Sequence, residues 1–429
     1  MSSSEANPPG VAGPSGAREG AGGIHYGWFI VAASFLVTFT LAEAFYAFGV
    51  FIGPLEAEFG WKRATTSSAM TAFLISYSLS AFTMGRLGDR YGPRLVVSIG
   101  GLLAALGFVL ASRTENIWHL RAALFVSGMG AGSCWSVPSA TVQRWFVRRR
   151  GLATGLSATG VGMGAFVMVP LSYYLVENFG WRTAYFVMGL IILVITVSGA
   201  QLLVHSPEKK GLRAYGAGET ESRPSVTVAP MSAEMDLGQA VRTGAFLALV
   251  PLLMVTQIPT QLMIAHLIPF ATSVGISAAL AATAMGLLGG LSIPGRLLIG
   301  AACDRIGWQR ALGASNIGMG VMCLFLLLVR NYPMLLLFVL IYSTFHGGRN
   351  PPQVGILGYF FGVRALGGLI GLTQALSLLV GAAGPYVAGY IFVETQSYAL
   401  AFVLAAVLFV VGGFLQLLHG SFGWLPQIE

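Results

Sequence analysis

Charged residues are scarce in this chain. Only 9% of its 429 residues are Asp, Glu, Lys or Arg, whereas 55% are hydrophobic, and soluble domains carry about 25% charged residues. The mean hydropathy is +0.75. This composition excludes a soluble globular protein. It predicts a membrane protein, and the length leaves room for roughly a dozen helices of about 20 residues each.

Cysteine is also scarce. Cys134, Cys303 and Cys323 lie in or beside apolar segments, and no C-x-x-C spacing occurs. We therefore expect buried thiols, with neither a disulfide nor a metal site. The chain also lacks a Walker A pattern and a nucleophile–base constellation, so it predicts neither ATP hydrolysis nor an enzyme, and we expect no cofactor.

The net charge of +8 does not indicate a nucleic-acid partner, because the basic residues form short clusters between apolar segments. Such clusters set the topology of membrane helices. Residues 1–23 are rich in Gly, Ser, Ala and Pro and have no apolar core. They predict a disordered cytoplasmic tail rather than a signal peptide.

Twelve apolar runs, six on each side of a polar segment, predict an all-α membrane protein with two six-helix bundles. We expect a first bundle at 24–204, a cytoplasmic linker at 205–240, a second bundle at 241–420 and a cytoplasmic tail at 421–429. The runs lie at about 27–52, 65–84, 95–112, 117–141, 151–175, 183–204, 244–271, 277–302, 310–329, 333–357, 366–393 and 398–418.

Basic residues are distributed unevenly between the gaps that separate these runs. Counted by alternate sides, 17 of the 24 Lys and Arg residues lie on the side of the termini and the linker, six lie on the other side, and Arg296 lies inside a run. The positive-inside rule then places both termini and the linker on the cytoplasmic side. We expect the chain to lie in the cytoplasmic (inner) membrane.

The two halves repeat a motif at an offset of 215 residues. Gly85-Arg-Leu-Gly-Asp89-Arg-Tyr-Gly recurs as Gly300-Ala-Ala-Cys-Asp304-Arg-Ile-Gly. Each carboxylate can pair with nearby arginines or with a helix N-terminus in one conformation and release it in another. The alternative is a solvated turn that only sets topology. The residues predicted to form these cytoplasmic gate motifs are Gly85, Asp89, Arg90, Arg94, Gly300, Asp304, Arg305 and Arg310.

Twelve spans with this motif in both halves resemble the major facilitator superfamily. Within it, HYGWFIVAASF (25–35), RWFVRRRGLATGLSATGVGMG (144–164), HLIPFATSVGIS (266–277) and GGRNPPQVGILGYFFGVRALGGLIGL (347–372) resemble bacterial monocarboxylate and oxalate/formate transporter relatives. The resemblance implies alternating access about a site between two six-helix halves. The lysine that oxalate/formate exchangers use at 366–393 is absent, which speaks against oxalate exchange.

Arg296 is the only charged residue between Ala278 and Cys303. A guanidinium in hydrocarbon costs about 3 kcal/mol or more, so it either snorkels to the headgroups or lines a polar cavity. Gly295 and Pro294 favour the cavity. The resemblance implies that Arg296 binds a substrate carboxylate. The resemblance also implies a difference: mammalian-type members carry an aspartate one turn earlier as part of proton coupling, whereas this chain has Ser292.

Three other ionisable residues inside the apolar runs each allow two interpretations. Glu43 either binds a proton reversibly or reaches water near the end of its span, and His266 is either a proton-responsive gate or a hydrogen-bonded wall residue. Arg349 is a second carboxylate ligand or, as we rather expect, a cytoplasmic gate or headgroup contact. Further candidates for substrate contact are Trp135, Ser133, His346, Asn350 and Gln374.

The sequence therefore predicts a secondary transporter that moves a small monocarboxylate, such as lactate or pyruvate, together with a proton. We expect a monomer whose partners are the substrate, the proton and membrane lipid. Two alternatives stay open: an efflux transporter of hydrophobic compounds on the same fold, which would tolerate loss of Arg296, and a non-transporting membrane receptor.

Overall fold

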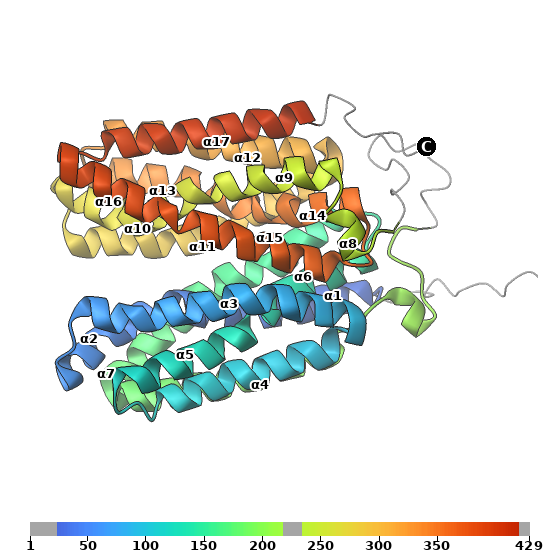
Figure 1. Ribbon diagram of the computed structural model, residues 1–429, viewed down its shortest axis with the longest axis horizontal. Helices are drawn as coiled ribbons and strands as arrows, with labels where there is room; N and C mark the ends of the chain where they lie inside the picture. The colour runs from blue at the N-terminus through green and yellow to red at the C-terminus, as the bar shows by residue number, and fades with distance from the viewer. Residues whose placement is uncertain (1–23, 218–233, 420–429) are drawn as a thin grey trace, which may run out of the picture.

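The computed structural model describes residues 24–217 and 234–419, and in this part of the chain the structure is helical (Figure 1). The predicted tails at 1–23 and 421–429, and residues 218–233 of the predicted linker, lie outside the described residues. The helices group into two bundles, one formed by α1–α7 and the other by α8–α17. The first bundle comprises α1 (Gly27–Ala42), the π-helix η1 (Glu43–Ala47), α2 (Phe48–Phe59), α3 (Arg63–Tyr91), α4 (Pro93–Ala111), α5 (Ile117–Ala131), α6 (Ser133–Trp145) and α7 (Arg150–Leu202).

The second bundle follows a 3-10 turn, η2 (Pro207–Lys210), in the connecting segment. Its elements are α8 (Leu237–Ala240), α9 (Gly244–Val255), α10 (Gln257–Ser273), α11 (Ala278–Ile306), α12 (Trp308–Phe325), η4 (Leu326–Leu328), α13 (Tyr332–Gly348), α14 (Asn350–Phe361), α15 (Leu366–Gly381), α16 (Ala383–Thr395) and α17 (Ala399–His419).

Eight helical stretches of the described chain are long and apolar enough to cross a membrane. The longest, α7, contains a left-handed residue, Gly180 at φ +78°, which divides it into two membrane helices. Three further spans are less apolar or are not continuous helices: α3 is rich in Ser and Thr, and the α5/α6 and α13/α14 spans are interrupted at Gly132 and Arg349. The predicted all-α fold with about twelve membrane helices is confirmed.

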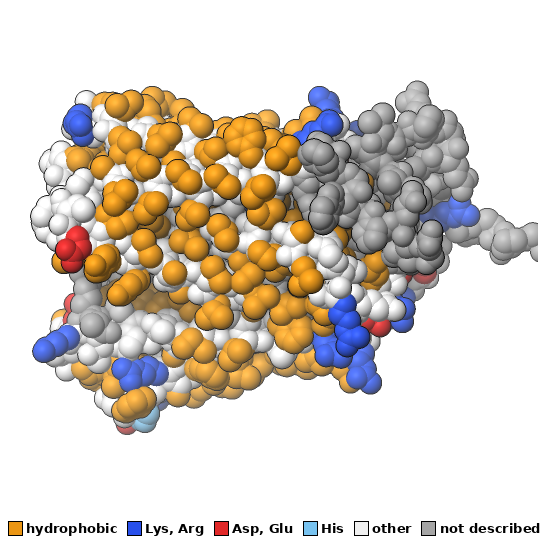
Figure 2. Space-filling view, turned by 45° about the horizontal axis from the view of Figure 1, so that its top comes forward, with side chains coloured by type: hydrophobic (Ala, Val, Ile, Leu, Met, Phe, Trp, Pro, Cys, Tyr) orange, Lys and Arg blue, Asp and Glu red, His pale blue; other side chains and the backbone are white. Residues whose placement is uncertain are grey.

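Each bundle buries its own apolar core. Phe51, Phe73 and Phe108 are buried in the first bundle, and Phe338 and Phe402 are buried in the second. Apolar side chains also cover the outer surface between the two ends of the molecule, and the visible Lys and Arg side chains lie toward the ends (Figure 2). A surface of this kind fits a protein surrounded by lipid, because hydrocarbon offers no hydrogen-bond partners.

Glycines bring the two bundles into close contact along two helix pairs. On α3 and α15, a Cβ at Gly85 would collide with the backbone of Gly367. On α7 and α11, a Cβ at Gly151 would collide with the carbonyl of Gly300. Since Gly85 and Gly300 are equivalent in the repeat, each bundle meets the other through the same pair of surfaces. Small residues allow such close approach between membrane helices.

The segment after α7 returns to the first bundle. Tyr215 pairs with Phe146 in an isolated parallel bridge, and its ring lies 5.4 Å from that of His25 and 5.9 Å from that of Trp28. The Trp145 indole donates a hydrogen bond to the carbonyl of Val204 (2.8 Å). These contacts hold residues 204–215 against the short connection between α6 and α7.

Candidate functional site

Arg296 lies on α11, where this helix packs against α7 of the other bundle. Its side chain is only 4% exposed, and Nη1 donates a 2.9 Å hydrogen bond to the carbonyl of Ala158 on α7. Gly162 leaves room for this group, because a Cβ there would stand 2.9 Å from Nη1. The guanidinium therefore points into the interface between the bundles, which does not match the snorkelling alternative.

The charge of Arg296 has no carboxylate partner among the described residues. The ion pairs found there join Arg144 to Asp89, Arg182 to Glu58 and His119 to Glu115. The Nε atom of Arg296 is buried without a hydrogen-bond partner. The Ser292 hydroxyl donates to the carbonyl of Gly289 (2.6 Å), so it does not offset the charge. A buried guanidinium with free donors is a site for an anion.

Two further ionisable side chains lie within electrostatic range of Arg296. Tyr46 belongs to η1 in the first bundle and is 42% exposed. His346 belongs to α13 and also lies within range of Arg349. The His346 ring stacks on that of Tyr342, with centroids 5.9 Å apart. Ionisable side chains from both bundles thus lie within electrostatic range of Arg296.

Three of the predicted contact residues line one small cavity between the bundles. Trp135 comes from α6, Asn350 from α14 and Gln374 from α15, and Gln353 and Thr373 complete its polar wall. Arg296 does not line this cavity. The sequence candidates therefore fall into two groups, one around Arg296 and one around Gln374.

Arg349 lies between α13 and α14, with twelve helical residues still to follow. It is 4% exposed, and its guanidinium donates to the Thr256 carbonyl (3.1 Å), the Thr260 hydroxyl (2.8 Å) and the Gln257 side chain (2.6 Å). Assigning it to the cytoplasmic end was wrong, since it is buried in mid-span. Its guanidinium therefore donates hydrogen bonds to residues at and just after the break between α9 and α10.

Two other candidates make contacts within their own bundle. The Ser133 hydroxyl donates to the Gly130 carbonyl (2.9 Å) and lies where a Cβ at Gly100 of α4 would stand. It therefore faces the interior of the first bundle. The His266 ring is 2.9 Å from the Pro385 carbonyl and 3.3 Å from the Tyr398 hydroxyl, which joins α10 to α16 and to the start of α17. These contacts match the wall reading of His266.

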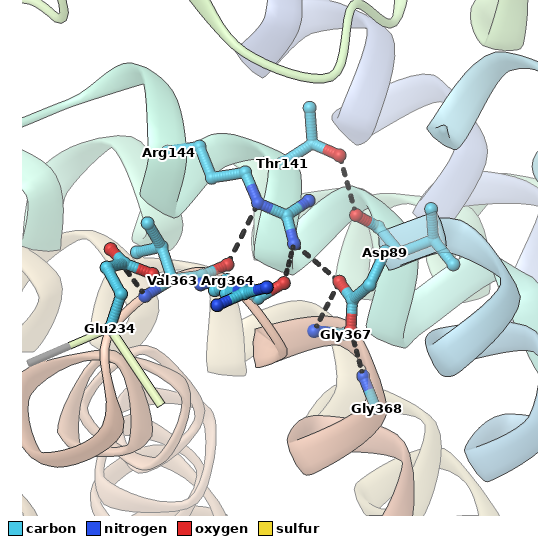
Figure 3. Close-up of polar contacts among 9 residues, drawn as sticks. Asp89, Thr141, Arg144, Glu234, Val363, Arg364, Gly367 and Gly368 are labelled. Carbon is cyan, nitrogen blue, oxygen red and sulfur yellow. Dashed lines mark hydrogen bonds and ion pairs between the residues drawn. The ribbon is translucent and has the colours of Figure 1, made fainter. Parts of the chain in front are cut away.

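Asp89, at the end of α3, binds the start of α15 in the other bundle (Figure 3). Its carboxylate accepts hydrogen bonds from the backbone N–H groups of Gly367 (3.0 Å) and Gly368 (2.8 Å) and pairs with Arg144. The Arg144 Nε also donates to the Val363 carbonyl (3.0 Å). Because the N-cap residue of α15 supplies no side-chain hydrogen bond, Asp89 caps this helix from across the interface.

Asp304, at the end of α11, makes the equivalent contact with the first bundle. Its two carboxylate oxygens accept hydrogen bonds from the N–H groups of Gly151 (2.8 Å) and Leu152 (3.1 Å), in the first turn of α7. The N-cap residue of α7, Arg149, also offers no side-chain cap. The two aspartates therefore clamp the bundles together crosswise. We call this end of the molecule, on the right in Figure 1 where α8 lies, the motif end.

The clamp partners differ from the arginines that the motif suggested. Arg90, Arg94, Arg305 and Arg310 are exposed, whereas the pairing arginine, Arg144, lies in the last turn of α6 and is 9% exposed. Its burial does not fit a lipid-headgroup contact. The sequence suggested a helix N-terminus as one possible partner of each carboxylate, but it did not indicate which backbone N–H groups, because a glycine N–H carries no sequence signal. The internal repeat offers a signal for these partners. Gly151 and Gly367 are 216 positions apart, close to the offset of the motif, and each follows a basic residue by one to three positions.

Two membrane-spanning bundles, clamped crosswise at one end and enclosing polar side chains between them, define a membrane transporter. The chain belongs to the Major Facilitator Superfamily, whose model matches residues 34–315 and 267–421. It is thus a secondary transporter and not an enzyme. The resemblance to this superfamily drawn from the sequence is confirmed.

Distant relatives of this chain include monocarboxylate transporters. Monocarboxylate transporter 12 of Mus musculus is 26% identical over 402 residues, which cover 88% of this chain and 82% of the relative. Monocarboxylate transporter 11 of Homo sapiens is 28% identical over 424 residues, covering 94% and 84%.

Solved structures share the fold at low identity. The major facilitator transporter FucP in the outward conformation matches with a TM-score of 0.73 and 15% identity over 92% of this chain and 99% of that chain. The human organic anion transporter MFSD10 matches with a TM-score of 0.71 and 17% identity over 91% and 99%.

Proposed function

We propose that this protein moves small monocarboxylates, such as lactate or pyruvate, together with a proton across the cytoplasmic membrane. The observation that carries the proposal is Arg296, a buried guanidinium between the bundles with no carboxylate partner among the described residues. An arriving carboxylate would supply the missing counter-ion. The similarity to monocarboxylate transporters 11 and 12 over most of the chain supports this class of substrate.

In this proposal the motif end faces the cytoplasm and both termini lie there. The excess of Lys and Arg on that side supports the orientation, and it persists when Arg349 is removed from the count because that residue is buried in mid-span. The Asp89 and Asp304 clamps then hold the carrier closed to the cytoplasm.

Transport follows from rocking of the two bundles about the Arg296 region. The carboxylate pairs with Arg296 while the motif end is closed. The clamps then open, the Arg296–Ala158 contact between α11 and α7 breaks, and the substrate leaves toward the cytoplasm. The anion neutralises Arg296 and the proton that travels with it neutralises an acidic side chain, so the loaded carrier has no uncompensated buried charge and reorients at lower cost. The carrier works as a monomer surrounded by lipid.

Uptake by proteoliposomes under an imposed pH gradient tests the proposal. Labelled formate, lactate, pyruvate, oxalate and an aromatic acid are compared for the wild type, Arg296→Ala, Arg296→Lys and the matched control Arg330→Ala, an exposed arginine. We expect monocarboxylate uptake that falls at least tenfold in Arg296→Ala and is retained in Arg330→Ala. Equal uptake by Arg296→Ala would refute the role of Arg296 and favour an efflux transporter of hydrophobic compounds.

A further inference from the structure

Glu43 is a buried acid that the Arg296 site does not use. It opens η1, in the middle of the first membrane span, and is 1% exposed. It lines a small cavity inside the first bundle. The other walls of that cavity are apolar apart from Tyr185, and they include Phe51 of α2, Met70 and Phe73 of α3, Phe108 of α4 and Leu124 of α5. The alternative in which Glu43 reaches water at the end of its span does not match this position.

The hydrogen bonds of Glu43 fit a neutral carboxyl group. Its Oε1 accepts a 2.7 Å hydrogen bond from the Ser172 hydroxyl of α7, whereas Oε2 is buried and has no partner. The Tyr185 hydroxyl, from the same wall, is also buried without a partner. Among the residues that the structure describes, no Lys, Arg or His lines the cavity. An ionised carboxylate left in such a place costs several kcal/mol, and a protonated one avoids that cost.

We propose that Glu43 is the proton-binding site of the transporter, with Ser172 and Tyr185 as its hydrogen-bonding partners, and that it is separate from the anion site at Arg296. The inference rests on the proposed proton-coupled function. The proton adds to Oε2, which then donates into the cavity toward the Tyr185 hydroxyl. The Ser172 hydroxyl continues to donate to Oε1. Within the described part of the chain, Tyr185 of α7 is the one titratable group on the cavity wall besides Glu43, and α2, α3, α4 and α5 contribute apolar side chains there.

The π-helix η1 connects this proton site to the anion site. Its five residues, Glu43–Ala47, carry Glu43 on the face toward the cavity and Tyr46 within electrostatic range of Arg296. A π-helical turn in a membrane helix is an irregular element that often occurs at functional sites. When the proton leaves Glu43, the ionised carboxylate needs water or a new donor. The turn that carries it must then rearrange, and Tyr46 moves relative to Arg296.

The Glu43→Gln variant tests the proton site, because glutamine copies the shape of a neutral carboxyl group and cannot release a proton. We expect the variant to fold, to exchange labelled lactate for unlabelled lactate at equal pH, and to lose at least tenfold in the accumulation driven by a pH gradient. Glu58→Gln is the matched control, since Glu58 lies on the same span but is half-exposed and paired with Arg182. It should accumulate lactate as the wild type does.

Infrared spectroscopy provides a second readout that does not depend on transport. The purified protein should show the carbonyl stretch of a protonated carboxylic acid, which Glu43→Gln removes and Glu58→Gln leaves in place. Ser172→Ala should move this band to higher frequency, because it removes the hydrogen bond to Oε1. This variant also carries the test if Glu43→Gln does not fold.

The two proposals fail in different ways. Gradient-driven accumulation by Glu43→Gln at the wild-type level, or an unchanged infrared band, would overturn the proton site and leave the carboxylate site standing. Absence of carboxylate uptake by the wild type would overturn the proposed function, and the infrared comparison alone would then decide whether Glu43 holds a proton.

Discussion

The clamp at Asp304 gives the sharpest prediction about the conformational equilibrium. Replacing Asp304 with asparagine removes the charge and turns one of the two acceptors into an N–H₂ group that faces the N–H of Gly151 or Leu152. The first turn of α7 has no cap of its own, so the variant leaves part of a helix N-terminus unsatisfied. Only the state closed at the motif end loses these contacts.

The expected magnitude follows from the two hydrogen bonds. A hydrogen bond to a charged group contributes about 1.5–3 kcal/mol, and asparagine keeps one acceptor. The variant should therefore destabilise the closed state by about 2 kcal/mol relative to the open state. Since 1.4 kcal/mol corresponds to a factor of ten, the population open at the motif end should rise about 30-fold.

A native cysteine reports this opening. Cys303 is 2% exposed and lies beside the clamp, because a Cβ at Gly151 would stand 2.9 Å from the Cβ of Cys303. The other cysteines, Cys134 and Cys323, are buried in the bundle cores, and Cys134→Ser and Cys323→Ala leave Cys303 as the single thiol. We expect Asp304→Asn to increase the rate at which a membrane-impermeant maleimide labels Cys303 by about 10- to 100-fold.

Two controls separate opening from unfolding. Glu115→Gln changes an exposed acid far from the interface and should leave the labelling rate unchanged. A protein that retains only Cys134 should remain unlabelled in the Asp304→Asn background, since the core of the first bundle stays closed. The reasoning is wrong if Cys303 labelling does not change, or if Cys134 becomes reactive in parallel.

Three further substitutions follow from the contacts between and within the bundles. Gly155→Val should separate α7 from α11, because a Cβ at Gly155 collides with the carbonyl of Arg296; lactate uptake should fall at least tenfold, whereas Gly49→Val, which meets no neighbour, should transport normally. Arg349→Met should lower the melting temperature measured in detergent, since it removes three hydrogen bonds at the break between α9 and α10 and leaves buried acceptors without a donor, which costs about 3 kcal/mol; an unchanged melting temperature would contradict this role. Tyr215→Ala should free residues 204–215 from the α6/α7 connection, so limited proteolysis should cut there faster than in the wild type, and equal cutting rates would show that the aromatic contacts do not hold the segment.

Much of the fold could be predicted from hydropathy alone. A span of about 20 apolar residues must form a helix in lipid, because its backbone groups have no other partners. The repeat of Asp89 at Asp304 then indicated two equivalent halves. Helix breaks were harder to predict: Pro351 and Pro352 follow the break at Arg349, whereas Gly132 interrupts its helix with no proline beside it. Their effect depends on neighbours that accept or donate the freed backbone hydrogen bonds.

The candidate site was predicted only in part. Arg296 could be singled out because an isolated charge in an apolar run is expensive. Its direction could not be read from spacing, since snorkelling and a cavity require the same residue type. Arg349 looked similar in the sequence, yet the structure surrounds it with three acceptors, whereas Arg296 keeps an unpartnered Nε atom.

The sequence by itself determined that this chain spans a membrane many times and is built from two related halves. Both properties depend on local composition and on repeats along the chain. Only the tertiary structure decided which group meets which: Asp89 with Gly367 and Asp304 with Gly151 across the interface, and Glu43 with Ser172 inside the first bundle. Each pair joins residues more than a hundred positions apart, and the close packing of α3 on α15 and α7 on α11 brings the clamp residues within hydrogen-bonding distance.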